Sequence, residues 1–407
     1  MPKRIAYVVD YFPSVSETFV QNEIAYLASL GWQVRVFALK AQASEHRHAA
    51  VNWLVDLTDY CSNRLVLSKE MLRAHLAAFA RAPYRYLSTL GFTVANSLTS
   101  VGDLTRGIYC FVKAVYFAEM ARGYSIQHIH AHFAYNRAAV AMLMARLAGI
   151  TFSFTGHSHE VVLGVPMFAA KVRNARFIVV SSDFIRRKLE GWFPNLDPRK
   201  VHVIRTGIDL KCFQPPSSQS NHVASRILTV ARLIECKGIH VLIDACEMLR
   251  ERGKEFQCTI VGDGQLRGEL ERRIEAYGLQ SRVRILGHVG DDELALLLQQ
   301  ATVFALPCLM DSTGVHDGLP VALIEAMAMG LPTVSTRLSA IPELIEDGVC
   351  GVLVEEKDVV ALADALERIM EDAELRRHLA TAARSKVERE YEIGDNVSRL
   401  AALFEQA

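Results

Sequence analysis

The feature that most constrains the fold is a regular alternation of short apolar runs and amphipathic stretches in the second half of the sequence. The apolar runs lie at 226–230, 257–261, 283–286, 302–306, 333–335 and 351–354. Segments with helical periodicity lie between them, at 238–252, 265–277, 291–300 and 317–330. Parallel strands need a crossover connection, usually a helix, so the alternation predicts a parallel sheet with helices on both faces.

The first half repeats this pattern less regularly. Its apolar runs lie at 5–9, 33–39, 127–131, 151–155, 177–181 and 201–205. The 407 residues suffice for two domains, each with its own core. Proline and serine residues between the halves mark a linker. We therefore expect a first domain at 1–210, a linker at 211–224, a second domain at 225–390 and a C-terminal helix at 391–407.

A charged turn in the second half indicates a site for a diphosphate. Arg232 and Lys237 follow directly after the strand predicted at 226–230. Two cations at a strand-to-helix turn are placed to neutralise a pyrophosphate, Arg232 with a planar fork and Lys237 as a point charge.

A predicted helix in the segment 317–330 also indicates a site for a diphosphate. Pro320 suits its first turn, because the missing N–H of proline costs nothing there, and Gly330 ends it. Asp317 lies just before this helix and Glu325 inside it, with the free N–H groups that attract a diphosphate between them. From spacing alone, an ordinary core helix with a capping aspartate and a solvated glutamate explains the pattern equally well.

Two further loops of the second half follow predicted strands. Gly262 and Gly264 permit a close approach of the backbone to a nucleotide, but the next glycine is Gly268, so a G-x-G-x-x-G dinucleotide fingerprint is not supported. His288 follows the next strand, in a position to touch the base through backbone groups.

Together these segments resemble the nucleotide-sugar half of the retaining family 4 glycosyltransferases of the GT-B architecture, of the type that makes bacterial exopolysaccharides such as colanic acid and amylovoran. The family motif has two acidic residues separated by seven, preceded by an Arg/Lys pair. Arg232, Lys237 and Glu325 match this motif, and Asp317 stands where glutamate is more usual. The resemblance implies an α/β fold with two Rossmann-like, doubly wound domains facing a cleft, a helical insertion in the first domain, and a last helix that crosses back onto it.

The first half carries the resemblance in three short runs: SETF at 16–19, HAHF at 130–133 and FTGH at 154–157. Ser16 is expected to cap the first helix, with Glu17 complementing its dipole. The resemblance puts Ser16, Glu17 and Thr18 near the donor phosphates or the acceptor, and His132 in the cleft. It implies that His157 contacts the transferred sugar by a hydrogen bond. A plain capped helix and a structural histidine with satisfied hydrogen bonds remain the alternatives.

The roles implied by the resemblance are as follows. Arg232 and Lys237 stabilise the leaving diphosphate, Glu325 holds the ribose hydroxyls, and Asp317 holds sugar hydroxyls or a phosphate edge. The residues expected to bind the donor are Gly262, Gly264, His288, Gly318, Leu319, Pro320 and Val321. No side chain is an obvious covalent nucleophile, so attack on the same face of the sugar with retention is favoured, and a covalent intermediate stays open.

A metal site is considered because alternate histidines share one face of a strand, and His128, His130 and His132 alternate. No carboxylate or cysteine accompanies them in the sequence, and the resemblance implies that no metal cofactor is needed. We therefore expect the nucleotide diphosphate sugar to be the donor substrate, without a metal ion.

The segment 64–123 interrupts the alternation with helical pattern throughout. It carries eight basic residues against three acidic ones, and the basic ones are Arg64, Lys69, Arg73, Arg81, Arg85, Arg106, Lys113 and Arg122. Basic amphipathic helices often lie on anionic membranes, each cation near the surface adding roughly 1 kcal/mol. A helical insertion that packs on its own domain, with solvated charges, is the alternative.

Composition sets the remaining bounds. The chain has 45 basic and 45 acidic residues, so it has no net positive charge that would favour binding to nucleic acid. The eight cysteines form no C-x-x-C pair, no signal peptide is evident and no apolar run is long enough to span a membrane, so a cytoplasmic protein at the inner face of the cell membrane is expected.

The sequence therefore predicts a retaining hexosyltransferase that uses a nucleotide sugar and a saccharide acceptor, lipid-linked in the simplest case, in surface or exopolysaccharide synthesis. A nucleotide-sugar epimerase or phosphorylase on the same fold, or a non-catalytic scaffold of a polysaccharide assembly complex, are the competing hypotheses.

Overall fold

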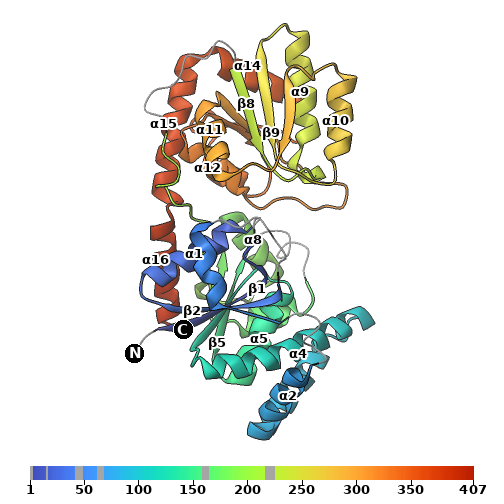
Figure 1. The fold of residues 1–407 in the computed structure, drawn as a ribbon, viewed down its shortest axis with the longest axis vertical. Coiled ribbons are helices and arrows are strands. Elements are labelled where there is room, and N and C mark those ends of the chain that lie inside the picture. The colour runs from blue at the N-terminus through green and yellow to red at the C-terminus, as the bar shows by residue number, and fades with distance from the viewer. Residues whose placement is uncertain (1–2, 15–16, 42–48, 62–67, 158–164, 216–224) are drawn as a thin grey trace. The chain divides into compact units, whose positions relative to one another are not determined.

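The chain folds into two compact units (Figure 1). The computed structural model describes residues 3–14, 17–41, 49–61, 68–157, 165–215 and 225–407. The first unit comprises Met1–Gly207 with Ile393–Ala407, and the second comprises Ile208–Glu392. The units therefore divide after Gly207 and after Glu392, beside the domain limits predicted at 210 and 390. Most of the predicted linker, 216–224, lies outside the described residues.

The first unit is built on a parallel sheet with the strand order β3-β2-β1-β4-β5-β6-β7. The strands are β1 (Arg4–Phe12), β2 (Gln33–Ala41), β3 (Thr58–Tyr60), β4 (His128–His132), β5 (Thr151–Gly156), β6 (Ile178–Val180) and β7 (Val201–Val203). The helices are α1 (Thr18–Ser29), α2 (Lys69–Arg81), α3 (Pro83–Ala95), α4 (Val101–Gly123), α5 (Asn136–Ala148), α7 (Phe168–Asn174), α8 (Asp183–Trp192) and α16 (Ile393–Glu405), with 3-10 helices η1 (Ala49–Leu57) and η3 (Pro198–Lys200).

Both faces of this sheet are buried, which explains why its strands read as nearly continuous apolar runs. Along β1, Tyr7 belongs to the core that α1 and α16 complete, whereas Ala6 and Val8 belong to the core shared with α4 and α5. Phe404 of α16 packs edge-on against Tyr7, with ring centroids 6.3 Å apart. Helix α16 therefore supplies part of the first unit's core from beyond the second unit in the sequence.

The second unit has a parallel sheet with the order β10-β9-β8-β11-β12-β13. Its strands are β8 (Ser225–Val230), β9 (Phe256–Val261), β10 (Val283–Gly287), β11 (Val303–Leu306), β12 (Thr333–Thr336) and β13 (Val352–Val354). Its helices are η4 (Glu235–Lys237), α9 (Ile239–Glu251), α10 (Arg267–Ala276), α11 (Asp291–Gln300), α12 (Val321–Ala328), α13 (Ile341–Leu344), α14 (Val359–Glu371) and α15 (Ala373–Glu390).

Each sheet contains a point where the strand order reverses. In the first unit this point lies between β1 and β4, and in the second between β8 and β11. The connections that leave the carboxyl ends of these strands diverge to opposite faces and leave a crevice, where open α/β sheets bind their ligands. The two reversal points are therefore the places to search for functional residues.

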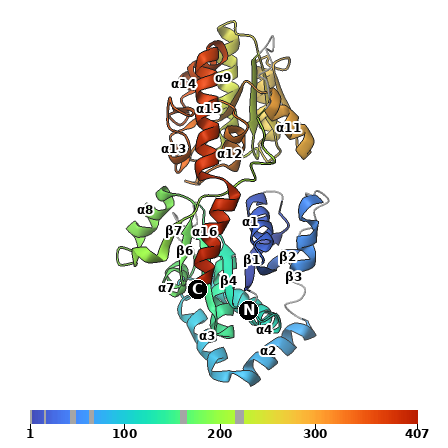
Figure 2. The same ribbon diagram turned by 90° about the vertical axis from the view of Figure 1, so that its left-hand side faces the viewer.

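The helical character predicted for 64–123 is confirmed for the described residues, which form α2, α3 and α4 (Figure 2). The basic residues of this segment do not all lie exposed and unpaired at its surface. Lys113 is buried and donates hydrogen bonds to the carbonyls of Leu39 and Cys61, each at 2.7 Å. Arg122 pairs with Glu119, and Arg64 lies outside the described residues. No helix among the described residues is long and apolar enough to cross a bilayer.

Short elements account for most of what the pattern missed. The sequence did not predict α7, α13, η1 or β3, and of these α13 and β3 have only four and three residues, too few to show a period of their own.

Candidate functional site

Two predicted charges of the second unit meet where its strand order reverses. Lys237 ends η4, in the connection after β8, and Asp317 lies in the connection after β11. The Lys237 ammonium donates a hydrogen bond to Asp317 Oδ2, and both side chains are largely shielded from solvent. Burial acts to lower the pKa of Lys237, but the Asp317 carboxylate outweighs it and raises that pKa above its ordinary value. The ammonium is therefore a permanent positive charge at this edge of the sheet.

Gly238, directly after Lys237, lets this connection pack closely on the end of β11. Its φ is 66°, and a Cβ there would lie 1.9 Å from the carbonyl oxygen of Pro307. The N–H of Leu309 donates to the carbonyl of Cys236 at 3.0 Å across the same contact. The close packing fixes the position of the Lys237 backbone.

The connections after β8 and β9 are also in backbone contact. A Cβ on Gly262 would lie 1.9 Å from the carbonyl oxygen of Ala231, and one on Gly264 would lie 2.5 Å from that of Leu233. The N–H of Leu233 donates to the carbonyl of Asp263 at 2.9 Å. The two glycines therefore allow the start of the Arg232–Lys237 connection to pack directly on the loop after β9.

Arg232 and His288 lie at the same end of the sheet with exposed side chains. Burial raises the pKa of the Cys236 thiol, and the charge of nearby Arg232 opposes that rise. The backbone N–H of Gly264 lowers the pKa of Asp263, and His288 adds to this effect. Both predicted residues are therefore near the loops that surround Lys237.

Helix α12 begins one residue later than predicted. Pro320 occupies the N-cap position, so it precedes the first turn, and no side chain caps the helix. The end is as predicted, because Gly330 has a φ of 66° and its N–H donates to the carbonyl of Met327. Gly318, Leu319 and Val321 lie around this N-terminus, and Glu325 is half-buried one turn into the helix.

Two carboxylates that the sequence reading did not single out order the loop between β11 and α12. Glu235 accepts a hydrogen bond from the Ser312 hydroxyl at 3.0 Å. Asp311 accepts the backbone N–H groups of Thr313 and Val315 at 2.8 and 2.9 Å. The loop that carries Asp317 is therefore tied both to itself and to η4.

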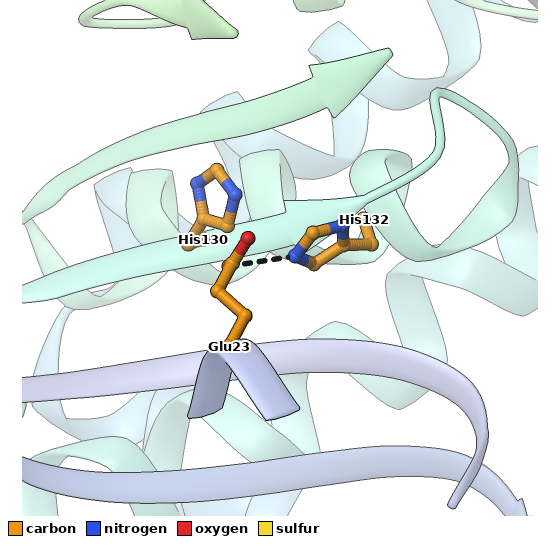
Figure 3. Close-up of side chains that lie close together, drawn as sticks. All are labelled: Glu23, His130 and His132. Atoms are coloured by element: carbon orange, nitrogen blue, oxygen red, sulfur yellow. Dashed lines mark hydrogen bonds and ion pairs between the residues drawn. The ribbon is translucent and has the colours of Figure 1, made fainter. Parts of the chain in front are cut away.

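In the first unit, His132 and His157 belong to a hydrogen-bonded chain of four side chains, together with Tyr7 and Glu23. Tyr7 donates its hydroxyl to Glu23 Oε1 at 2.8 Å, and His132 Nε2 lies 2.9 Å from the same oxygen. His132 Nδ1 in turn lies 2.9 Å from His157 Nε2. Figure 3 shows Glu23 reaching from α1 to the histidines of β4.

Burial sets the protonation of this chain. It raises the pKa of Tyr7 well above its ordinary value, and the Glu23 carboxylate adds to the shift. It lowers the pKa of His157 well below its ordinary value, with further contributions from His132 and Arg137. Tyr7 is therefore a phenol and His157 a neutral imidazole at neutral pH.

No carboxylate lies near the histidines of β4 in the sequence, but the fold brings Glu23 of α1 to them. Glu23, His130 and His132 offer ligand atoms that all lie within 4.8 Å of one another. The ring nitrogens of His130 already lie 2.7 Å from the Ser153 hydroxyl and 2.9 Å from that of Thr155. The carboxylate joins these histidines through hydrogen bonding, and a metal ion would have to displace those bonds.

Glu17 also belongs to an ion-pair cluster that the sequence did not predict. It occupies the N-cap position of α1, which begins at Thr18, and the predicted cap Ser16 lies outside the described residues. The Glu17 carboxylate takes two hydrogen bonds at 3.0 and 3.2 Å from one amino group of Arg137, and a second group of that guanidinium lies 3.0 Å from Asp10. This buried arginine ties the β1–α1 connection to α5 at the reversal point.

One sequence signal for Glu23 exists. Val20, Ile24 and Leu27 form the buried side of α1, and Glu23 lies three residues after Val20 and four before Leu27. A carboxylate on the inward face of an amphipathic helix is costly unless it finds a partner. That position marks Glu23 as a residue with a specific role.

Comparison with known proteins agrees with this geometry. Residues 213–386 match the family model of group 1 glycosyl transferases, and residues 98–211 match that of glycosyltransferase family 4. The protein WcaL of Salmonella typhimurium, named a colanic acid biosynthesis glycosyltransferase, is 30% identical over 421 residues, covering 99% of each chain. The amylovoran biosynthesis glycosyltransferase AmsK of Erwinia amylovora is 40% identical over 207 residues, covering 51% of each chain.

Solved structures agree on the fold. A glycosyltransferase of Rickettsia africae matches with a TM-score of 0.73 and 16% identity, covering 100% of this chain and 98% of that one. Anabaena HepE in complex with UDP and glucose matches with a TM-score of 0.71 and 16% identity, covering both chains in full. The chain therefore belongs to the group 1, or family 4, glycosyltransferases, with the two Rossmann-like units of the GT-B fold, and is a glycosyltransferase.

Proposed function

We propose that the protein transfers a hexose from a nucleoside diphosphate sugar to a saccharide acceptor, with retention at the anomeric carbon and without a metal ion. The observation that carries the proposal is the convergence of Lys237, Asp317 and the uncapped N-terminus of α12 at one reversal point.

The diphosphate half of the donor fits the charges of the second unit. A helix N-terminus presents N–H groups and a partial positive charge, and Lys237 adds a full one. As the bond between sugar and phosphate breaks, negative charge grows on the leaving diphosphate. Fixed positive groups that meet this charge lower the barrier, and Arg232 at the exposed rim adds to them.

The remaining carboxylates suit the neutral parts of the donor. Glu325, one turn into α12, is suited to accept hydrogen bonds from ribose hydroxyls. Asp317 shares its charge with Lys237, and is suited to bind a hydroxyl of the sugar or to hold the ammonium against the phosphates. The loop after β9, which carries Gly262 and Gly264, is proposed to lie against the nucleotide, and its two glycines let it pack closely on the connection after β8.

The names of the relatives guide the choice of acceptor. WcaL and AmsK are named for colanic acid and amylovoran biosynthesis, and both of these are polysaccharides. We therefore propose a growing saccharide in surface or exopolysaccharide synthesis, carried on a lipid, as the acceptor. His157 would meet a sugar hydroxyl in the first unit.

The test is a panel of UDP- and GDP-linked hexoses, with donor consumption and the anomeric configuration of the product followed by NMR. We expect one donor to be consumed much faster than the others, with the anomeric configuration of the donor kept. Inversion, or equal inertness of the whole panel with active enzyme controls alongside, would contradict the proposal. A Glu325→Gln variant should raise KM for the preferred donor, because it weakens the bonds to ribose.

We further propose that helices α2 and α3 dock on an anionic phospholipid membrane. Leu72, Leu76 and Phe79 recur every three to four residues on α2, and their exposed fractions are 61%, 60% and 45%. Tyr84 and Leu87 are exposed apolar side chains on α3, at 86% and 55%. The exposed cations on α2 and α3 are Lys69, Arg73, Arg81 and Arg85, and Arg81 pairs with Glu119 of α4. An apolar stripe flanked by cations is the pattern of interfacial helices, and the cations favour anionic headgroups.

The membrane proposal is tested by co-sedimentation with vesicles of phosphatidylglycerol and phosphatidylcholine. Replacing Leu72, Leu76 and Phe79 together by serine should abolish binding. A matched control is Leu296→Ser, since Leu296 is 55% exposed on α11 of the second unit. Binding that survives the triple replacement, or equal binding to pure phosphatidylcholine, would contradict docking through this surface.

A further inference from the structure

We infer that the first unit has a second ligand site, at the end of its sheet opposite the reversal-point crevice, and that this site binds a phosphate ester. The site is a hollow of about 550 Å³. Its charged lining consists of Arg146, Arg176 and Lys200, with one carboxylate, Asp197. The inference is independent of the proposed sugar transfer, because these residues take no part in it.

The hollow lies at the amino ends of three neighbouring strands. Thr151 begins β5, Arg176 lies two residues before β6, and Lys200 lies directly before β7. The amino ends of parallel strands share one edge of a sheet, whereas the crevice at a reversal point lies at the carboxyl edge. The length of β5 therefore separates the hollow from His157, which follows the carboxyl end of that strand.

Arg146 of α5 has hydrogen-bond donors that its neighbours leave largely unused. Its guanidinium carbon lies 4.0 Å from the ring centroid of Phe92 on α3, a cation–π contact. Its Nη1 lies 3.4 Å from Asn174 Oδ1, which is long for a hydrogen bond, and its Nε is buried without an acceptor among the described residues. A guanidinium held by packing in this way is suited to a bidentate contact with phosphate oxygens.

Arg176 and Lys200 add two charges that repel each other. The Lys200 ammonium donates to two backbone carbonyls at the end of α7, at 3.1 and 3.3 Å, which leaves one of its three N–H groups for a ligand. Arg176 donates to the carbonyl of Gln406 at 3.3 Å. Burial lowers the pKa of Lys200; the Asp197 carboxylate opposes this shift, and the charge of Arg176 adds to it. An anion bound between the two cations would relieve their repulsion.

The carboxylate of the lining is already paired. Both oxygens of Asp197 accept hydrogen bonds from the guanidinium of Arg199, at 3.0 and 3.1 Å for the shorter contact of each. These bonds lower the pKa of Asp197, so it stays ionised. Since Arg199 is not among the residues that line the hollow, it compensates Asp197 from outside and leaves the three lining cations in excess.

The rest of the lining indicates that the ligand has an organic part. Apolar side chains make up most of it, namely Met142, Ala145, Ile150, Phe152 and Ala175. The volume lies in the range of pockets that hold small organic molecules, and a phosphate ion alone would leave these side chains in contact with water. A phosphate ester fits both the cations and the apolar surface.

Two sources supply this chemistry, an anionic phospholipid and a soluble phosphate ester, and the position of α3 favours the lipid. Phe92, beneath Arg146, belongs to α3, one of the two helices proposed above to dock on a membrane. Arg85 of the same helix reaches the rim of the hollow. A Cβ on Gly149, next to Ile150 of the lining, would lie 2.3 Å from its Nη1.

The test is isothermal titration calorimetry of the whole protein with three probes: inorganic phosphate, glycerol 3-phosphate, and dihexanoyl phosphatidylglycerol below its critical micelle concentration. We expect an ester to bind, and its binding to weaken as salt is added. Tighter binding of the lipid than of glycerol 3-phosphate identifies a lipid site, and the opposite order, or equal binding, identifies a site for soluble esters. No binding at up to about 10 mM, or inorganic phosphate that binds as tightly as either ester, overturns the inference.

Variants locate the binding. Arg146→Gln and Arg176→Gln should each raise the Kd of the ester about tenfold, because each removes a charge-assisted hydrogen bond. The matched control is Arg173→Gln, which removes an exposed arginine of α7 outside the lining and should leave the Kd unchanged. Thermal unfolding followed by circular dichroism checks that each variant folds. Arg176 is exposed, so its variant keeps the test valid even if Arg146→Gln is unstable.

A further variant separates this hollow from the diphosphate site of the second unit, where a phosphate ester can also bind. Binding to the hollow should survive Lys237→Ala. Binding that is lost in Lys237→Ala but kept in Arg176→Gln, or lost equally in Arg173→Gln and Arg176→Gln, overturns the inference. None of these measurements involves sugar transfer, so failure of the proposed function leaves this inference standing, and failure of this inference leaves the proposed function untouched.

Discussion

The ammonium of Lys237 is held by the carboxylate of Asp317 across the point where the strand order of the second unit reverses. This pair makes a specific prediction about how the two side chains depend on each other. Lys237→Ala should lower kcat/KM for transfer about 100-fold, because it removes a positive charge from the leaving diphosphate. The double variant Lys237→Ala/Asp317→Ala should be no worse than the single one, since the carboxylate that repels the phosphates is also gone.

The control for the Lys237 and Asp317 variants is Lys254→Ala in the same unit. Lys254 lies just before β9, at the amino end of that strand, where it pairs with Glu367, and its replacement should leave transfer unchanged. Independent losses that multiply in the double variant would show that Lys237 and Asp317 do not act as a pair.

A comparison of Gly238 with Gly278 separates the cost of a left-handed backbone from the cost of a steric clash. Gly238 and Gly278 have φ values of 66° and 64°, but a Cβ on Gly238 would meet Pro307, whereas one on Gly278 meets nothing within 4 Å. Gly278→Ala should cost about 1 kcal/mol of stability from the left-handed backbone alone. Gly238→Ala should cost roughly 3 kcal/mol more through the clash, measured by urea unfolding followed by circular dichroism. Equal costs would show that the connection relaxes freely.

The buried histidines predict how the first unit responds to acid. Burial lowers the pKa of His128 to about 3, and holds those of His130 and His157 well below their ordinary value. In the unfolded chain these groups bind a proton below about pH 6.5, while the folded unit keeps them neutral. The free energy of unfolding should therefore fall as the pH drops below 6.5, by about 1.4 kcal/mol per pH unit for each histidine.

Tryptophan fluorescence can follow this transition selectively, because Trp32, Trp53 and Trp192 all belong to the first unit. A His130→Gln variant, although less stable at every pH, should show a slope smaller by about 1.4 kcal/mol per pH unit. An unchanged slope would mean that His130 does not titrate on unfolding.

Removal of divalent metal should leave transfer intact. Lys237 and the N-terminus of α12 already supply positive charge for a diphosphate, so we expect the same kcat with excess EDTA as with magnesium. A loss of more than about tenfold in EDTA, recovered by adding one metal, would contradict this prediction.

Local sequence patterns predicted much of the fold, and two of the charged residues that they singled out, Lys237 and Asp317, form a pair in the structure. The inner strands of both sheets, such as β4 and β11, are fully buried, so their apolar runs stand out in the sequence. The cations and carboxylates of the second unit follow strands directly in the sequence. The first-unit chain could not be found this way. His132 and Glu23 lie 109 residues apart and meet only because α1 packs over β4. The periodicity of apolar residues predicts which face of a helix is buried. It does not predict which residue of another element that face contacts.

Pro320 shows the limit of local rules on a finer scale. The pattern of proline followed by apolar residues correctly predicts a helix, yet the residue lies at the N-cap, one position before the turn it was expected to begin. A proline fits both positions, because its N–H is not needed at either. Helix ends inferred from a single residue type are therefore uncertain by about one position.

The placement of α16 bears on how the chain folds during synthesis. Val397, Leu400 and Phe404 belong to the same core as Ile5 and Trp32, although the whole second unit lies between them in the sequence. A ribosome must therefore finish the second unit before the first can close its core, and until then Ile5 and Trp32 lack that apolar cover. In a cell, the early part of this protein should depend on chaperones longer than the part made after it.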